Sequence, residues 1–508
     1  MRTTLRYIRE SMKQNTNAKI ASLNGKFIED PTVRTFERHL LGEILHSDEE
    51  CYEAARRVWS GMIDPRHPAM IVRCATAADV ARSVEFARSN EIAVAVRGGG
   101  HSLTGDSFCD GGMVIDLSGM KKIEVDRTRC VARADAGLTA GEFDLATKAF
   151  GLASVMGECS SVGIAGFTLG GGLGRLMGRY GAACDNLLSA ELVGADGMFL
   201  RASADENADL FWAIRGGGGN FGIATSFEYR LHHVDQVLIG ALMYPVSATR
   251  EVLTFLDEFM MSIPDEMEIS VDIGNTSMTA WAPGVTLPVI SLGVSFCGSI
   301  KQGQAALRPL RRFRKPLADT IRVMPYYDSQ GVFDLRPLTN FVSAGGCVAI
   351  EGGFIERIGD EAIDVIVAAI AEAPDLYWIS ADHYMHGAIC RYTSDHMAFA
   401  LRCPGYCSRV FSAWRKPAQG DMATTWVKRL SAVLEPFSGG AAYLNYLTQR
   451  DSYKGVQVAY GSNLKRLALL KSKYDPTNFF NSNRNIRPAA AKPVEGLLAG
   501  TTNFTAAH

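Results

Sequence analysis

Two glycine-rich segments of this 508-residue chain each carry one reactive side chain. His101 follows three consecutive glycines within residues 94–106, and Cys159 stands inside the segment 157–166. Glycine has no Cβ, so the backbone N–H groups of such loops can approach a phosphate group or a flat ring closely. Taken alone, His101 is better explained as a turn cap and Cys159 as a small buried thiol. The pairing of the two segments favours a binding site for a phosphate-bearing or planar ligand.

Two more glycine clusters follow along the chain. The first, 167–175, again leaves out side chains where a ligand could pass, although tight packing of two backbones is an alternative explanation. In the second, Gly217, Gly219 and Gly222 match the spacing Gly-x-Gly-x-x-Gly of dinucleotide-binding proteins. This run follows an expected helix and enters an expected strand, whereas the dinucleotide fingerprint follows a strand and opens a helix. The context therefore argues against NAD(P) as a partner.

In order and residue types, these segments resemble the berberine bridge enzyme-like branch of the vanillyl-alcohol oxidase/p-cresol methylhydroxylase flavoproteins. The resemblance extends from about Asp64 to Pro488 and includes Arg-Gly-Gly-Gly-His and Gly-x-Cys-x-x-Val-Gly. It implies that the protein binds FAD, with His101 bonded to the 8α-methyl group and Cys159 to C6 of the flavin ring. The other cofactor contacts that the resemblance implies are Arg97, Gly98, Gly99, Gly100, Ser102, Gly157, Val162, Gly163, Gly166, Thr168, Gly172, Gly222, Ile223, Asn445 and Asn463.

The resemblance also implies which residues act on a substrate. Residues 442–446 alternate as a strand, and Tyr446, the second tyrosine of a Tyr-x-Asn-Tyr motif, is expected to be the catalytic base. A rough alignment places Arg391 where alkaloid-cyclising relatives have a glutamate base. A cation cannot accept a proton, but it could help to ionise a tyrosine, whose ordinary pKa near 10 is too high for a base at neutral pH. The expected substrate-lining residues are polar aromatic side chains: Trp378, His383, Tyr384, Tyr392 and Tyr443.

These residues together imply an FAD-dependent oxidoreductase that oxidises an alcohol group of a sugar, a glycosylated metabolite or another secondary alcohol. The hydroxyl proton would pass to Tyr446 and the hydride to flavin N5. Val162 is a valine as in oxidase members of the family, which favours O2 as acceptor and H2O2 as product. Two alternatives keep the flavin: a dehydrogenase that reduces a carrier, and a tailoring oxidase acting on a C–N or C–C bond. A third is a non-catalytic flavin-binding protein in which Tyr446 belongs to the core.

The composition is that of a soluble globular protein, with 47% hydrophobic and 21% charged residues. A net charge of −2 lacks the basic excess of nucleic-acid-binding proteins. No apolar run is long enough to span a membrane, and the N-terminus has no signal-peptide core, so we expect a cytoplasmic protein with reduced thiols. The cysteine and histidine spacings match no metal-binding motif, so no metal is expected. The expected partners are a small organic substrate and molecular oxygen.

A chain of this length needs more than one hydrophobic core. Short strands mixed with helices, without regular alternation, indicate an α+β fold and not a doubly wound one. Residues 188–193 and 198–202 are expected to form a hairpin around an Asp-Gly turn. Together with the family resemblance, this implies a leader (1–60), a two-subdomain FAD-binding domain of the p-cresol methylhydroxylase type (61–235), a substrate domain with an antiparallel sheet backed by helices (236–440), a segment returning to the FAD domain (441–490) and a flexible tail (491–508).

Overall fold

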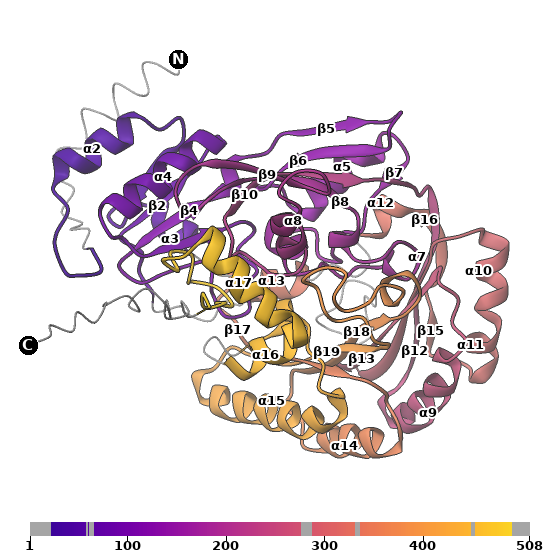
Figure 1. Cartoon of the computed structure of the whole chain (residues 1–508). Coiled ribbons are helices and arrows are strands. Elements are labelled where there is room, and N and C mark those ends of the chain that lie inside the picture. Colours follow the sequence, from indigo (N-terminus) through magenta and orange to yellow (C-terminus); the bar gives the residue numbers. More distant parts are fainter. Residues whose placement is uncertain are drawn as a thin grey trace, which may run out of the picture.

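The structure is a computed structural model, which describes residues 22–56, 59, 66–275, 287–330, 336–448 and 453–489. The expected tail 491–508, and residues 1–21, 57–58 and 60 of the expected leader, lie outside the described residues. Three main sheets form the framework, and helices pack around them (Figure 1). The mixture of separate sheets and helices confirms the expected α+β class.

The first sheet has four strands in the order β1-β2-β4-β3, of which β2, β4 and β3 run parallel. Helix α4 (Ala77–Ser89) begins with a capping box, in which Thr76 and Asp79 each accept a hydrogen bond from the other's amide. This box satisfies two of the free amides at the helix start. The loop that carries His101 leaves the sheet directly after β3. The strands are β1 (Glu43–His46), β2 (Met70–Arg73), β3 (Val94–Arg97) and β4 (Met113–Asp116).

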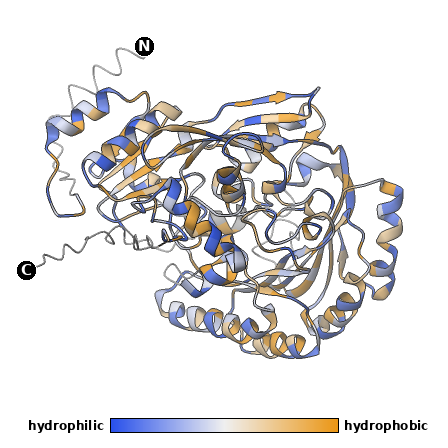
Figure 2. Ribbon diagram, viewed as in Figure 1, coloured by the Kyte–Doolittle hydropathy of each residue, from blue (hydrophilic) through white to orange (hydrophobic). Residues whose placement is uncertain are grey.

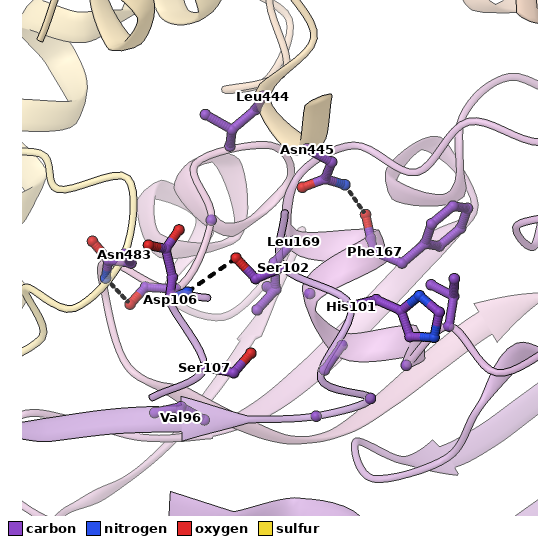
Figure 3. A pocket seen from close by; sticks show the side chains of 18 of the residues that line it. Val96, His101, Ser102, Asp106, Ser107, Phe167, Leu169, Leu444, Asn445 and Asn483 are labelled. Atoms are coloured by element: carbon purple, nitrogen blue, oxygen red, sulfur yellow. Dashed lines mark hydrogen bonds between the residues drawn. The ribbon is translucent and has the colours of Figure 1, made fainter. Parts of the chain in front are cut away.

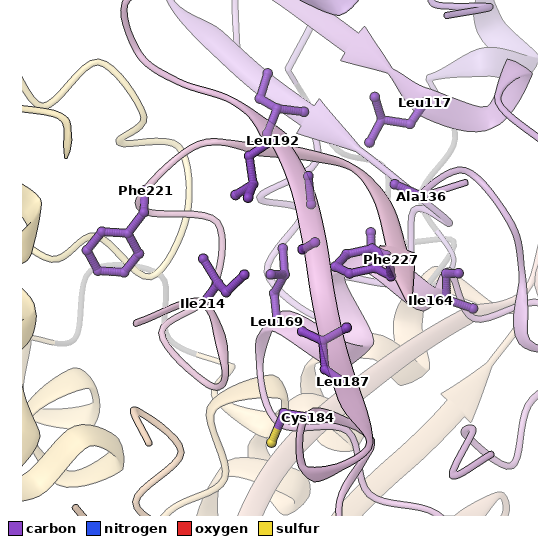
Figure 4. Packing of buried hydrophobic residues seen from close by; sticks show 14 of the residues in the cluster. Leu117, Ala136, Ile164, Leu169, Cys184, Leu187, Leu192, Ile214, Phe221 and Phe227 are labelled. Carbon is purple, nitrogen blue, oxygen red and sulfur yellow. The ribbon is translucent and has the colours of Figure 1, made fainter. Parts of the chain in front are cut away.

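The second sheet is antiparallel, with five strands in the order β5-β6-β10-β8-β9. The expected hairpin is β8 with β9, and its turn contains Gly197 at a φ of +81°, which favours glycine. Buried residues such as Leu117, Ile164 and Phe227 join this sheet to the first in one hydrophobic cluster (Figure 4). The strands are β5 (Ile123–Asp126), β6 (Val131–Asp135), β8 (Leu187–Val193), β9 (Phe199–Ser203) and β10 (Ile223–Arg230).

The third sheet is antiparallel and carries the expected helices on one face. Its main order is β15-β12-β14-β13-β18-β19-β17, and β16 also pairs with β12. Helices α9 (Thr249–Met260), α14 (Asp360–Ala371) and α15 (Gly420–Leu434) cover the face turned away from the other sheets (Figure 1). These helices carry both hydrophilic and hydrophobic residues, and their apolar sides form a second core with the sheet (Figure 2). The strands are β12 (Gln236–Pro245), β13 (Met267–Asn275), β14 (Pro288–Phe296), β15 (Ala318–Asp319), β16 (Arg322–Pro325), β17 (Cys347–Ile355), β18 (Tyr377–Met385) and β19 (Gly405–Trp414).

Shorter elements connect the sheets. Helix α5 contacts β5 and the short strand β7, and helix α7 lies against the single turn 387–390. The remaining elements are α2 (Asp30–Arg38), α3 (Tyr52–Ala55), α5 (Ala140–Lys148), α6 (Ile164–Leu169), α7 (Met177–Tyr180), α8 (Ala208–Ile214), α10 (Ile300–Ala306), α11 (Arg308–Phe313), α12 (Tyr326–Ser329), α13 (Arg336–Ser343), β7 (Leu152–Ala153) and β11 (His232–His233).

The expected strand at 442–446 is wrong, because the structure forms a 3-10 turn, η8 (Leu444–Tyr446), at this place. The turn crosses the edge strand β17 at close range instead of pairing with it. A Cβ added to Gly352 of that strand would lie 2.1 Å from the carbonyl oxygen of Tyr446. The glycine therefore provides the space through which the turn passes.

Two helices, α16 (Tyr453–Tyr460) and α17 (Leu464–Tyr474), lie near the end of the described chain (Figure 1). Helix α17 packs on α8 and carries a fully buried ion pair, with 2.7 Å between Lys471 Nζ and Asp475 Oδ2. Lys471 Nζ also donates to the carbonyl oxygens of Asn220 and Phe480, each at 2.8 Å. This one ammonium group therefore ties α17 to the glycine loop before β10 and to the segment after the helix.

Replacing this ammonium group tests its structural role. Lys471→Met leaves Asp475 buried without its cation, so we expect the free energy of unfolding to fall by about 3 to 5 kcal/mol, measured by chemical denaturation. Lys473→Met is the matched control, because Lys473 is an exposed lysine of the same helix and pairs with Asp209 of α8. An exposed pair contributes only about 0.2 to 1 kcal/mol. Equal losses in the two variants would contradict the prediction.

Candidate active site

A cavity of about 340 Å³ lies where the glycine loops, the third sheet and the C-terminal segment meet. Its lining comes from residues far apart in the sequence, between Trp59 and Arg484. Most of the residues expected from the sequence lie around this one space. Those that line it are Gly98, Gly99, Gly100, His101, Ser102, Gly157, Cys159, Val162, Gly163, Gly166, Gly222, Ile223, His383, Tyr443, Asn445 and Tyr446.

His101 and Cys159 meet at one hydroxyl group. Ser161 Oγ lies 2.9 Å from His101 Nε2 and 3.2 Å from Cys159 Sγ. Both reactive atoms therefore lie within reach of the same small group, on the same wall of the cavity. Two positions on one edge of a flat ring would be accessible to them at the same time.

The electrostatic surroundings keep His101 neutral. Burial, with a smaller effect from the guanidinium of Arg97, lowers the pKa of the imidazole to about 4. The ring of Trp59 stacks on it at a centroid distance of 5.5 Å. A neutral, oriented imidazole retains a free lone pair at neutral pH, which a nucleophile requires.

Close backbone contact between two glycines brings these segments together. A Cβ added to Gly99 would lie 2.3 Å from the amide nitrogen of Gly163, and one added to Gly163 would lie 2.2 Å from that of Gly99. The amide of Ala140 also donates to the carbonyl of Val162 at 2.8 Å, which fixes the second segment on helix α5. Any side chain at either glycine would push the loops apart.

Other glycines are open toward the cavity itself. A Cβ added to Gly166 or Gly219 would meet no atom within 4 Å, and one added to Gly98 would meet only Ala165 Cβ at 3.7 Å. Protein packing therefore does not require glycine at these positions. Their common property is that a side chain would project into the cavity, so the residues present fit a large flat ligand with a phosphate-bearing tail.

The cavity is elongated, with different chemistry at its two ends. Figure 3 shows His101 beside Phe167 at one end, and Asp106 beside Asn483 at the other. At the second end Ser102 Oγ accepts from the amide of Asp106 at 3.1 Å, and Arg484 Nη1 lies 3.4 Å from Asp106 Oδ2. A cofactor with a ring at one end and charged groups along its length matches this arrangement.

Tyr443 and Asn445 form a rigid corner beside the ring end. Asn445 Nδ2 donates to Phe167 O at 3.2 Å and to Tyr443 Oη at 2.9 Å. Tyr443 Oη also accepts from the amide of Gly172 at 3.3 Å. These bonds connect the C-terminal segment to the third glycine cluster and place Tyr446, one residue further, at the cavity wall.

Tyr446 lies next to a cation, but the cation is not the one expected. The guanidinium carbon of Arg409 lies 5.1 Å from the centre of the Tyr446 ring. Burial raises the pKa of Tyr446 well above its ordinary value, and the charge of Arg409 acts in the opposite direction. The third sheet provides this neighbour, because Arg409 lies on the cavity face of β19.

A chain of buried polar groups holds Arg409 in place. Arg409 Nε donates to Asp382 Oδ2. Ser380 Oγ lies 2.5 Å from Asp382 Oδ1 and 2.7 Å from Asp272 Oδ1. Burial, and then the nearby charge of Asp382, raise the pKa of Asp272 to about 7, while the pKa of Asp382 is lowered because Arg409 outweighs its burial. The pair Arg409–Asp382 is therefore ionised, and Asp272 behind it is partly protonated near neutral pH.

Four of the expected cofactor residues lie outside the cavity lining, and each has a structural partner instead. Thr168 Oγ1 is 2.7 Å from Tyr229 Oη, and Arg97 Nη1 donates to Asp116 Oδ2 at 3.1 Å. Asn463 Nδ2 donates to the carbonyl of Ser394 at 2.6 Å. A Cβ at Gly172 would lie 2.5 Å from Ala183 Cβ, so this glycine is required by packing.

The expected catalytic and substrate-lining residues between 376 and 392 also fall into two groups, those that line the cavity and those that do not. His383 lines the cavity, but Arg391 lies on the surface, where it pairs with Asp265. This corrects the role expected for Arg391, because the cation that accompanies Tyr446 is Arg409. Trp378, Tyr384 and Tyr392 also lie outside the lining: Trp378 donates to Asp272 at 2.9 Å and stacks on Phe411, Tyr384 packs against Tyr406, and Tyr392 is exposed.

Several lining residues were missed by sequence reasoning. A charged residue within the otherwise uncharged strand 405–414 was a usable signal for Arg409, since arginine is rarely buried without a partner. Glu158 stands directly beside Cys159 in the sequence, so its neighbour was a usable signal that it lies at the cavity. Trp59, Asn483 and Arg484 had none, because only the folded chain brings them to the cavity.

Metal-ligating clusters and membrane-spanning helices are both absent from the described residues. Among them, no group of three or more His, Cys, Asp or Glu side chains is placed to hold a metal ion. No helix within the described ranges has the length and apolar character needed to cross a bilayer.

Comparisons with known proteins match both parts of the site. Residues 68–203 match a family model described as an FAD binding domain, and residues 442–487 match one described as berberine and berberine like. An FAD-linked oxidoreductase of Dictyostelium discoideum is 31% identical over 427 residues, covering 83% of this chain and 89% of that protein.

Solved structures share the fold over nearly the whole chain. The crystal structure of 6-hydroxy-D-nicotine oxidase from Arthrobacter nicotinovorans is 28% identical, with a TM-score of 0.77, covering 89% of this chain and 98% of that one. Xylooligosaccharide oxidase from Myceliophthora thermophila has the same fold at 21% identity and a TM-score of 0.78, covering 91% and 100%. The protein therefore belongs to the berberine bridge enzyme-like family of FAD-linked oxidoreductases.

Proposed function

We propose that the cavity holds FAD through covalent bonds to His101 and Cys159, and that the enzyme oxidises a CH–OH group of a small organic substrate. The observation that carries this proposal is the shared approach of His101 Nε2 and Cys159 Sγ to Ser161. Two nucleophiles at one end of an elongated cavity suit two attachment points on one ring. The substrate class proposed is a sugar, a glycosylated metabolite or another secondary alcohol.

The bound flavin supplies one chemical capacity, which is to accept a hydride at N5 and pass the electrons to O2, giving H2O2. The protein's own part is to bind, orient and deprotonate the substrate. Val162 lines the cavity three residues after Cys159, and its small side chain suits access of oxygen to the ring. Gly98 and Gly166 leave the cavity wall open for the ring itself.

Tyr446 is the proposed base. It lies on the wall of the cavity beside Arg409, and its phenolic oxygen would take the proton of the substrate hydroxyl while the adjacent C–H bond breaks. Its raised pKa means that the phenolate is the minor form at neutral pH. Arg409, held by Asp382, stabilises this form and is the proposed positioning residue.

A second candidate reaction is oxidation at a C–N bond. The similarity to 6-hydroxy-D-nicotine oxidase, whose named substrate contains nitrogen rings, favours it. Transfer of electrons to a carrier instead of O2 is the corresponding alternative for the second half of the reaction. The substrate panel and peroxide assay described below separate these possibilities.

Covalent attachment is tested by mass spectrometry of the acid-denatured protein. We expect the wild type to keep FAD on peptides containing His101 and Cys159, each single variant (His101→Ala or Cys159→Ala) to keep it through the remaining bond, and the double variant to release it. Cys184→Ala is the control, because Cys184 is a buried thiol outside the cavity lining. Release of all flavin from the wild type would contradict covalent attachment.

The base is tested by anaerobic flavin reduction with a panel of sugars, secondary alcohols and amines, followed by peroxide detection in air. With the best alcohol, Tyr446→Phe should slow reduction about 100- to 10,000-fold, because general base catalysis is lost. Tyr406→Phe is the matched control, since its buried hydroxyl makes no hydrogen bond within the described chain and lies outside the cavity lining. A panel in which only amines reduce the flavin would select the second candidate.

The charge of Arg409 is tested by the pH dependence of the same reduction rate. If the phenolate of Tyr446 is the base, the rate rises with pH up to the pKa of Tyr446. Arg409→Met removes a charge that lowers this pKa, so the rising limb should move to higher pH. Arg409→Lys keeps the charge and should leave the limb closer to its wild-type position. An unchanged limb in Arg409→Met would exclude this role.

A further inference from the structure

A β-bulge turns His383 toward the cavity. In β18, Tyr377, Ile379 and Ala381 contribute to the core under the helices, so regular alternation would place residue 383 on that same face. The pairing of β18 with β19 shifts between Ala381 and His383, which makes Asp382 the extra residue. His383 then lines the cavity together with Arg409 of the next strand. Bulges often re-aim a side chain beside an active site.

A buried carboxylate fixes the orientation of this imidazole. His383 Nδ1 lies 3.2 Å from Glu268 Oε1 on β13, and the two residues are only 3% and 4% exposed. Within the described residues, Nε2 of the ring makes no hydrogen bond, so it is the nitrogen left to bind a ligand. Burial alone would lower the pKa of His383, but the carboxylates of Glu158, Glu268 and Asp382 outweigh it and raise the pKa. Because Nδ1 faces Glu268, Nε2 is the nitrogen that donates into the cavity when the imidazole is protonated, and the raised pKa extends the pH range of that form.

The cavity lining also includes a hydrogen-bond acceptor, the carboxylate of Glu158. Glu158 lines the cavity, and its Oε1 lies 3.4 Å from Nε of the buried Arg175. Arg175 Nη1 donates in turn to Gln330 Oε1 at 3.2 Å. Glu158 and His383 line the same cavity, and the negative charge of Glu158 contributes to the raised pKa of His383. The cavity thus offers a fixed donor and a fixed acceptor.

We propose that His383 and Glu158 bind a second hydroxyl group of the substrate, next to the one that is oxidised, so that the enzyme selects vicinal diols such as sugars over simple alcohols. A hydroxyl can accept from His383 Nε2 and donate to Glu158 at once. A carboxylate would be repelled by Glu158, and an ammonium group by the protonated imidazole. This inference rests on the proposed oxidation of a CH–OH group.

The same contacts give diol binding a defined pH dependence. The groups that face His383 are Glu158, Glu268, Asp382 and Arg409, from four different segments. Below the raised pKa of His383, Nε2 carries a hydrogen and donates it. Above that pKa, Nδ1 keeps its hydrogen for Glu268 and Nε2 loses its own. Binding of a diol should therefore weaken as the pH rises through this pKa.

Matched substrates test the inference by anaerobic stopped-flow reduction of the holoenzyme. The pairs are trans-cyclohexane-1,2-diol against cyclohexanol, and glucose against 2-deoxyglucose. We expect the wild type to bind each diol at least about tenfold more tightly than its partner, as for a hydrogen bond to a charged group. His383→Asn should abolish this preference and its pH dependence while changing the limiting rate much less. His383→Gln, whose longer amide can place a donor near the position of Nε2, should restore part of the preference.

His386→Asn is the matched control, because His386 is a buried histidine of the same segment that lies outside the cavity lining. Flavin content and thermal unfolding of each variant show whether it is folded, and Glu158→Gln provides an independent variant if His383→Asn is not. Equal binding of diol and mono-alcohol by the wild type, or an unchanged preference in folded His383→Asn, would overturn the inference alone. Failure of every alcohol to reduce the flavin would instead overturn the proposed function on which it rests.

Discussion

The backbones of Gly99 and Gly163 touch, and this contact sets the geometry of the whole site. Neither residue can carry a Cβ, because it would lie within 2.3 Å of the other's amide nitrogen. The contact brings two loops from different sheets to one place, so that His101 and Cys159 meet at a single serine hydroxyl. Helix α5, the second sheet and the turn that carries Asn445 then support these loops from behind. The open cavity and the reactive pair are two consequences of the same close approach.

Three polar side chains of the cavity lining are each paired with a buried partner. Glu158, His383 and Arg409 each face the cavity, and their respective partners, Arg175, Glu268 and Asp382, are buried behind it. A charge is costly to bury alone, and the buried partner offsets that cost while fixing the side chain in one orientation. Electrostatic groups held in this way need little reorganisation when a ligand binds. The antiparallel sheet supplies the rigidity for His383 and Arg409, because its neighbouring strands β18 and β19 present both side chains to the cavity, whereas Glu158 stands on the loop of Cys159.

Membership of the berberine bridge enzyme-like family accounts for the cofactor-binding framework, whereas the proposed substrate contacts are inferred from the geometry of the cavity. Glu158 stands beside the expected flavin-bonding cysteine, and His383 reaches the cavity only because of a bulge in β18. The proposed base Tyr446 lines the same cavity beside the cation Arg409. Cofactor retention, proton removal and substrate selection are thus assigned to different parts of one cavity.

Local signals in the sequence determined the α+β class, the hairpin of β8 and β9, the capped helix α4 and the glycine loops with His101 and Cys159, because each depends on residues close together in the chain. Only the tertiary structure decided that Arg409, and not Arg391, accompanies Tyr446, and that 442–446 forms a turn against β17 instead of a strand. Strand register, a one-residue bulge and long-range packing determine these features. They follow from which segments pack side by side, and a short run of residues contains no record of its distant neighbours.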